Sequence, residues 1–282
     1  MPCDNLPDNG RALDTVLRDL VDAVDPPVQA WLDTSVSTAT TMVDRITPEP
    51  TEADRRAVLA ATGFEDRSPV ATEPFSEWVI CGAFPGGRPA WESAGAVLTG
   101  DIAPFENRKL WLLNGGHSLL AYVGSLRGFA TVDEAVADDY CATLLRDWWQ
   151  TCRRHLPAPE AELSAYCAAL AERFANPRMR HSLAQIATDG SQKLPVRLLP
   201  VLRKERDAGR LPEPTVVMLA AWIRHVRGAG APVKDVRAAD LAGLATGSLG
   251  DAVPRLLVAL DPALADDAEL VAAVRESVGR AN

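Results

Sequence analysis

Apolar residues recur at helical spacing through the downstream two-thirds of the chain, and no other feature limits its fold as strongly. From Phe105 onward the apolar positions follow a period of about 3.6 residues, interrupted only by short polar or proline-containing turns. This pattern predicts a mainly α, multi-helical fold in which helices pack on helices. The predicted helices cover residues 105–127, 131–155, 160–174, 178–187, 194–208, 213–227 and 237–245, with further helices to the C-terminus.

The upstream third has a different texture and predicts a small α/β part. An amphipathic helix is predicted over residues 11–24, and a second over residues 51–61, where Thr51 is the expected N-cap. Between residues 64 and 105, short apolar runs alternate with proline and glycine, and Trp78 to Cys81 is the best strand candidate. The change in composition near residue 100 predicts a domain boundary. The two predicted domains are residues 1–100 and 101–282.

The charge balance excludes several classes of partner. The 282 residues include 29 basic and 38 acidic side chains, for a net charge of -9. Such a chain lacks the basic field that nucleic acids and anionic membranes attract. It has no apolar run long enough to cross a bilayer, and its start is not that of a signal peptide, so we expect a cytoplasmic protein. The five cysteines and four histidines lack CxxC or HxxxH spacing, so we expect reduced thiols and no metal site.

Lysine is scarce among the basic residues, since only four of the 29 are lysines. Arginine does not release its proton at physiological pH, so an amine that transfers protons cannot be replaced by arginine. Each lysine is therefore a candidate for acid–base chemistry, and the alternative for each is a surface charge without a function. The four are Lys109, Lys193, Lys204 and Lys234.

Three functional side chains interrupt the first of the downstream helices. At about 100° per residue, Asn114 lies about 140° and His117 about 80° around the helix from Lys109, so all three can reach one cavity. Burial of such groups costs free energy unless each finds a partner. A desolvated amine has a lowered pKa and becomes a usable proton acceptor. The alternative is a buried polar network that fixes helix packing.

A glycine pair, Gly115 and Gly116, lies within the same helix. Each glycine weakens a helix by about 1 kcal/mol relative to alanine. We therefore expect some group to approach the helix backbone closely at this point.

Two further polar clusters stand outside this helix. Asp44 and Arg45 lie side by side in a short apolar stretch before a proline, which indicates either a functional acid, a structural salt bridge or a helix start. Asp189 to Lys193 form a glycine-containing turn between two predicted helices. This turn can equally be a capping turn, with Pro195 in the first turn of the next helix.

At these residues the chain resembles the polyol-specific long-chain dehydrogenases and reductases, the family of mannitol 2-dehydrogenase and fructuronate reductase. The resemblance extends over nearly the whole chain, and six ordered motifs carry it. They are CDNLPDNG at 3–10, MVDRITP at 42–48, FPGGRPAWESAG at 84–95, FENRKLWLLNGGHSLLAYVG at 105–124, RFANP at 173–177 and IATDGSQKLP at 186–195.

The resemblance implies metal-independent hydride transfer between NAD or NADP and a sugar alcohol or hexuronate. It implies that Lys109 is the general base in oxidation and the general acid in reduction, and that Asn5 and Asn114 stabilise the developing alkoxide. It further implies that residues 101–282 resemble the C-terminal domain of 6-phosphogluconate dehydrogenase and that residues 1–100 are the remainder of a Rossmann-type domain. The remaining implied site residues are His117 and Asp44, which orient substrate hydroxyls, and Lys193, which contacts the far end of the substrate.

The chain departs from the family pattern at three points. Gln185 stands where relatives commonly have arginine, and Thr40 where they often have asparagine. No GxGxxG occurs, and Gly228-Ala-Gly230 follows a predicted helix rather than a strand. We therefore expect most of the nucleotide-binding half to be missing from this chain.

The missing motif leaves a second and a third interpretation open. The second is a non-catalytic remnant or polyol-binding module, and the third is an unstable fragment with exposed strand edges. Whether the protein is an enzyme or only a binding module, we expect it to bind a polyol or hexuronate and to be a monomer or weak oligomer.

Overall fold

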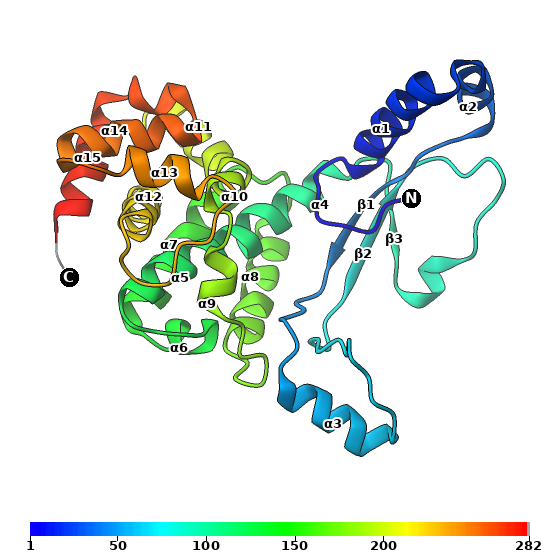
Figure 1. The fold of residues 1–282 in the computed structure, drawn as a ribbon, viewed down its shortest axis with the longest axis horizontal. Helices are drawn as coiled ribbons and strands as arrows, with labels where there is room; N and C mark the ends of the chain where they lie inside the picture. Colours follow the sequence, from blue (N-terminus) through cyan, green and yellow to red (C-terminus); the bar gives the residue numbers. More distant parts are fainter. Residues whose placement is uncertain (281–282) are drawn as a thin grey trace. The chain divides into compact units, whose positions relative to one another are not determined.

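The structure is a computed structural model that describes residues 1–280 (Figure 1). It divides into two compact units between Asn107 and Arg108. None of the helices in the described residues combines the length and apolar character that a bilayer crossing requires. All five cysteines are free thiols, as expected, and three of them are buried: Cys141, Cys152 and Cys167.

The first unit contains a three-stranded sheet in the order β1-β2-β3, in which β1 and β2 are antiparallel and β2 and β3 parallel. The register of β1 and β2 places Thr40 opposite Cys81 and Asp44 opposite Glu77. The elements are α1 (Asn9–Val24), α2 (Gln29–Ser35), β1 (Thr40–Asp44), α3 (Glu52–Thr62), β2 (Glu77–Cys81), β3 (Val97–Leu98), α4 (Ala103–Arg108) and two 3-10 turns, Pro26–Val28 and Trp91–Ala94.

Strand β2 confirms the predicted strand, and its apolar run has a clear cause. Ile80 packs in a cluster with Ala39 and Ala96, whereas Val79 packs in another with Met42 and Ile102. Because successive side chains of a strand point to opposite faces, both faces of the sheet are covered, and a continuous apolar stretch results.

The helix predicted over residues 51–61 is also confirmed. It is α3, and Thr51 forms a capping box with Asp54 at its start. Strand β1 was not predicted, because the Ser/Thr-rich residues before Met42 lack the apolar signal of a strand.

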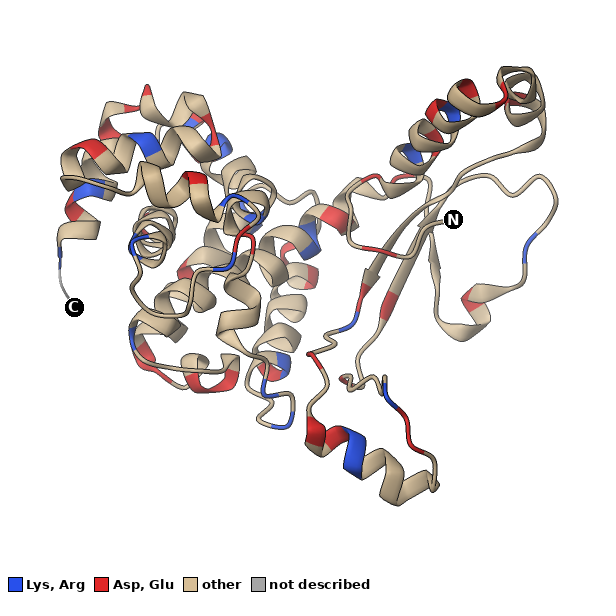
Figure 2. Ribbon diagram, in the orientation of Figure 1, with Lys and Arg blue, Asp and Glu red and all other residues tan. Residues whose placement is uncertain are grey.

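The second unit is almost purely helical, as predicted, and its acidic and basic residues are interspersed along the chain (Figure 2). Its elements are a π-helix (Lys109–Asn114), α5 (Gly115–Leu126), α6 (Val132–Val136), α7 (Asp139–Arg153), α8 (Glu160–Phe174), α9 (Leu183–Ala187), α10 (Gly190–Arg197), α11 (Leu199–Asp207), α12 (Glu213–Val226), α13 (Ala238–Leu244), α14 (Leu249–Leu260), a 3-10 turn (Pro262–Ala265) and α15 (Ala268–Gly279).

Two of the predicted helices are each divided into two. The helix predicted over 131–155 is α6 followed by α7, because Asp138 turns out of the helix and its side chain accepts a hydrogen bond from Cys141 N. The helix predicted over 194–208 breaks at Leu198, two residues before Pro200, which lies in the first turn of α11.

Helix α5 lies at the centre of the second unit, in contact with α7, α9 and α12 (Figure 1). Its residues from Gly115 to Ser125 are all buried, and it carries no charged side chain. Trp148, Trp222 and Tyr122 are among the largest fully buried side chains of the chain. A helix that is apolar on every side is stable only when other helices surround it, so α5 organises this unit.

A buried carboxylate, Glu205, ties α11 to the end of α7. Its oxygens accept hydrogen bonds from Arg154 and Arg210 at 2.8–3.1 Å, and they lie 2.5 Å from His155 Nε2. Burial by itself would raise the pKa of Glu205, but the hydrogen bonds from Arg210, Arg154 and His155 outweigh it and hold this pKa well below its usual value.

Replacing Glu205 by glutamine should lower the free energy of unfolding at pH 7 by about 1–3 kcal/mol, because three donors lose a charged acceptor while solvent screens the partly exposed arginines. A lowered carboxyl pKa stabilises the fold above the usual glutamate pKa, and this contribution is lost as the pH falls through the folded-state pKa. Urea titrations should therefore show the advantage of the wild type shrinking under acid conditions.

The matched control is Glu269→Gln, since Glu269 pairs with Arg206 while remaining 68% exposed. This change should alter the free energy of unfolding by less than about 0.5 kcal/mol. Equal losses in the two variants would contradict a special role for the buried carboxylate.

Candidate functional site

Lys109 and Asn114 are the first and last residues of a π-helix that joins α4 to α5. Here the sequence-based expectation of a regular α-helix is wrong. A π-helix forms hydrogen bonds between residues five apart, so residues i and i+5 lie nearly above one another. Asn114 is five residues after Lys109 and is therefore much closer to the same face than the 140° of an α-helix would place it. Lys109 is buried and Asn114 half-buried.

Two tryptophans of α7 donate hydrogen bonds to carbonyl groups of this π-helix. Gly115 N donates to Leu110 O, five residues back, rather than to Trp111 O as in an α-helix. Trp148 Nε1 donates instead to Trp111 O at 2.8 Å, and Trp149 Nε1 donates to Leu112 O at 2.9 Å. Each indole thus satisfies a carbonyl in a segment with irregular backbone pairing.

The glycine pair makes this contact possible, which confirms the predicted close approach. A Cβ on Gly115 would lie 2.8 Å from the Trp148 ring, and one on Gly116 would lie 2.9 Å from Leu145 and 3.2 Å from Trp149 Nε1. The group that approaches the backbone is therefore the face of α7.

His117 lies in the first turn of α5, buried between two rings. It stacks on Phe174 at 4.3 Å between ring centroids and meets His181 edge-on at 5.0 Å. Burial, reinforced by His181 and Arg197, lowers the pKa of His117 well below its usual value. Burial and Lys193 likewise lower the pKa of His181 to about 4. Both imidazoles are therefore neutral near pH 7.

Each of the two imidazoles has one ring nitrogen available for a ligand. His117 Nε2 and His181 Nδ1 are buried and have no hydrogen-bond partner among the described residues. Buried polar atoms in native proteins are nearly always paired, so an unpaired one indicates a missing partner such as a bound hydroxyl group.

Helix α10 contributes two cations, Lys193 and Arg197, which lie one turn apart. Lys193 Nζ donates to Ile186 O at 3.2 Å, and Arg197 donates to Ser118 Oγ at 3.1 Å and to Asn114 O at 3.5 Å. Burial lowers the pKa of Arg197 to about 10, and burial followed by Arg197 lowers the pKa of Lys193.

Neither cation forms an ion pair with a carboxylate of residues 1–280. Asp189 and Asp235 only offset the lowering of the Lys193 pKa through space. Both side chains are half-buried, and a partly desolvated charge without a counter-charge is costly, so this arrangement is suited to an anionic ligand group.

The turn before α10 fixes the position of both cations. Asp189 has a left-handed conformation, with a φ of 54°, and its Oδ1 accepts from Val236 N at 2.9 Å rather than capping its own helix. Ser191 N and Oγ both donate to Asp235. A Cβ on Gly190 would lie 2.3 Å from Tyr122 Oη, so only glycine fits there.

The alternative of a simple capping turn is thus wrong at this position. The turn is bound to the loop around Asp235, and the helix starts at Gly190, five residues before Pro195, which lies inside it.

Asn5 and Asp44 belong to the first unit. Asn5 lies exposed in the loop before α1, whereas Asp44 is buried at the end of β1. In the same loop motif, Asn9 attaches to the edge strand: its Nδ2 donates to Thr41 O and its Oδ1 accepts from Thr41 N, both at 2.9 Å. Asn9 therefore has a structural role, which was not predicted from the sequence.

Two residues of the cluster in the second unit were missed from the sequence, Arg197 and His181. A signal existed for Arg197, because it follows Lys193 by four residues and so shares its helix face. His181 precedes α9 without any local pattern, and only the packing of His117 brings it into the cluster.

Comparisons with known proteins match both parts of the chain. Residues 1–93 match the family model of the mannitol dehydrogenase Rossmann domain, and residues 101–281 match that of the mannitol dehydrogenase C-terminal domain. D-mannonate oxidoreductase of Escherichia coli (strain K12) is 40% identical over 230 residues, which cover 81% of this chain and 47% of the relative. D-arabinitol 4-dehydrogenase of Ralstonia nicotianae (strain ATCC BAA-1114 / GMI1000) is 37% identical over 229 residues, 80% of this chain and 49% of the relative.

A solved structure, the Pseudomonas fluorescens mannitol 2-dehydrogenase in ternary complex with NAD and D-mannitol, superimposes with a TM-score of 0.87 and 32% identity. The match covers 98% of this chain and 58% of that structure. The chain spans about half the length of the curated relatives given above.

Gly115→Ala should lower the free energy of unfolding by about 1–3 kcal/mol, because its methyl group displaces the Trp148 ring and weakens the indole bond to the π-helix. Gly243→Ala is the matched control: it lies in α13, with nothing within 4 Å of its Cβ position. The control should be neutral or more stable by up to about 1 kcal/mol. Urea titrations of both variants test this, and a Gly115 variant as stable as the control would contradict the tight contact.

Proposed function

The chain belongs to the mannitol dehydrogenase family, and we propose from this that it carries the acid–base site of an NAD(P)-dependent oxidoreductase for sugar alcohols or hexuronates. Within this proposal, residues 1–100 are the remainder of the nucleotide-binding domain and residues 101–282 form the helical substrate domain. The observation that carries it is the cluster on the π-helix, α5 and α10: Arg197 contacts Asn114, the neutral His117 lies near Arg197, and Lys109 is five residues before Asn114 on the same π-helix.

The hydride carrier in this proposal is NAD or NADP. In residues 1–280 no strand leads through a glycine-rich turn into an α-helix, which is the usual cradle for the pyrophosphate. The chemistry below therefore concerns only the side chains of this chain.

Lys109 is the proposed proton-transfer group. It accepts the proton of the substrate hydroxyl during oxidation and returns it to the carbonyl oxygen during reduction. An arginine could not do so, because it keeps its proton at physiological pH. The irregular helix supports this role, since π-turns occur frequently at functional sites.

Asn114 and Asn5 are the proposed hydrogen-bond donors to the developing alkoxide. Donors fixed in advance stabilise a charge that forms only in the transition state. His117, which is neutral, and Asp44 orient the hydroxyl groups of the substrate in this proposal. The unpaired Nε2 of His117 supports its part, because a substrate hydroxyl would supply the missing partner.

We further propose that the substrate carries a carboxylate, as a hexuronate or its alcohol does. Lys193 and Arg197 are half-buried with only neutral hydrogen-bond partners, and a carboxylate would supply their counter-charge. Gln185 stands where relatives commonly have an arginine. Arg197 now provides a second cation beside Lys193.

Lys109→Met, in the protein expressed from its complete reading frame, should lower kcat for NAD(P)-dependent turnover by about 10²–10⁴-fold while changing KM little. The matched control is Lys204→Met, on the exposed side of α11, which should leave kcat unchanged. Absence of turnover of every hexitol and hexuronate by the wild type would overturn the proposed activity. Turnover that survives in the Lys109 variant would overturn only the role of this residue.

Lys193→Met should raise KM for a hexuronate about tenfold or more and change KM for a hexitol of the same length much less, because only the former loses a charge-assisted hydrogen bond. Steady-state kinetics with both substrates measure this. Equal losses for the two substrates would contradict the proposed carboxylate contact.

A further inference from the structure

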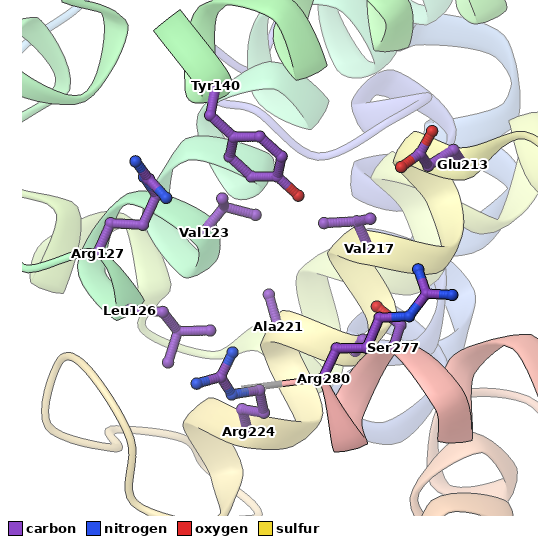
Figure 3. Close-up of a pocket in the computed structure, with 11 residues that line it drawn as sticks. Val123, Leu126, Arg127, Tyr140, Glu213, Val217, Ala221, Arg224, Ser277 and Arg280 are labelled. Atoms are coloured by element: carbon purple, nitrogen blue, oxygen red, sulfur yellow. The ribbon is translucent and has the colours of Figure 1, made fainter. Parts of the chain in front are cut away.

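A cavity of about 270 Å³ lies among α5, α7, α12 and α15, at the opposite end of α5 from the His117 cluster (Figure 3). Its lining includes Val123 and Leu126 from the last turns of α5, but none of the residues proposed for acid–base chemistry or substrate binding. Nothing in the proposed reaction uses this cavity, so its chemistry can be considered separately.

One wall of the cavity is apolar. It is formed by Val123 and Leu126 of α5 and by Val217 and Ala221 of α12 (Figure 3). Val123 and Ala221 are buried, whereas Leu126 and Val217 remain half-exposed to the cavity. A ligand with a short hydrocarbon part would remove this apolar surface from water.

Two arginines line the cavity at separate places. Arg224 of α12 lies beside Leu126, whereas Arg280, just after α15, lies beside Ser277 and is largely exposed (Figure 3). The guanidinium of Arg280 pairs with Glu276, but that of Arg224 has no hydrogen bond or ion pair with any described residue. Arg224 is half-buried, so it is held at the cavity with its donors unused.

The rim adds one donor and one negative charge. The Tyr140 hydroxyl points into the cavity, and Glu213 lies on the same side as Arg280 (Figure 3). Burial, followed by the charge of Glu213, raises the pKa of Tyr140, so this hydroxyl keeps its proton. Arg127 also lines the cavity, but Asp138 pairs with it at 2.8 Å. The single acidic group on the rim disfavours a ligand with two negative charges.

From this arrangement we propose that the cavity is a second ligand site, which binds a small organic monoanion. The acid group of the ligand pairs with Arg224, and its hydrocarbon part lies on Val217 and Ala221. The site is independent of the proposed oxidoreductase activity, because its lining shares no residue with that site.

Ligand-observed NMR titrations of the chain test the proposal with three probes: hexanoate, hexanol and inorganic phosphate. Hexanoate should bind saturably with a Kd of about millimolar order, as its size allows. Hexanol lacks the charge and phosphate lacks the hydrocarbon part, so both should bind at least about tenfold more weakly. Hexanol or phosphate binding as tightly as hexanoate would overturn the proposal, as would the absence of saturable hexanoate binding.

Variants then locate the binding. Arg224→Gln should raise the Kd for hexanoate about tenfold. Arg275→Gln is the matched control, because Arg275 lies exposed on α15 outside the cavity lining. Lys193→Met should also leave the Kd unchanged, which separates this site from the proposed carboxylate contact. Unaltered binding in Arg224→Gln, or a loss in Lys193→Met alone, would overturn the proposal.

Discussion

The hydrogen bonds from two indoles of α7 to the π-helix are the interaction on which the candidate site depends. An α-helix would satisfy its carbonyls internally, and it would place Lys109 and Asn114 on different sides. Trp148 and Trp149 supply donors to Trp111 O and Leu112 O, so the wider turn keeps its polar groups paired within an apolar core. Gly115 and Gly116 are required because the rings lie where a Cβ would stand. The segment with the proposed proton-transfer lysine is therefore determined by packing against α7.

The second constraint is buried positive charge. Lys193 and Arg197 are half-buried. Lys193 donates only to the carbonyl of Ile186, and Arg197 donates to the hydroxyl of Ser118 and the carbonyl of Asn114. The fold tolerates this because the turn before α10 is fixed at several points, to the loop around Asp235 and against Tyr122. Elsewhere in the unit a buried charge is fully neutralised, as Glu205 is by its arginine and histidine partners. The contrast supports the proposal that the cations of α10 bind a ligand group.

Much of the fold could be predicted from local sequence. The limits of α8 coincide with the predicted 160–174, and α12 ends one residue before the predicted limit. Both helices follow a proline, which is a local signal for a helix start. Strand β2 and the Thr51 cap were likewise local features. One error was local, since Pro200 ends the preceding helix two residues before it. Another arose from a distant partner, because β1 pairs with β2, more than thirty residues further along the chain.

The sequence by itself determined the helical class, the family motifs and the scarcity of lysine that marks Lys109 and Lys193. These depend on residue type and on spacing along one segment, which a sequence records directly. The tertiary structure alone decided the π-turn, the neutral pair of His117 and His181, and the uncompensated charge of Arg197. Each depends on what lies beside a side chain, since hydrogen-bond partners, desolvation and counter-charges come from other helices. No local pattern specifies such partners, because they meet only when α7, α8 and α10 pack against the helix that carries the motif.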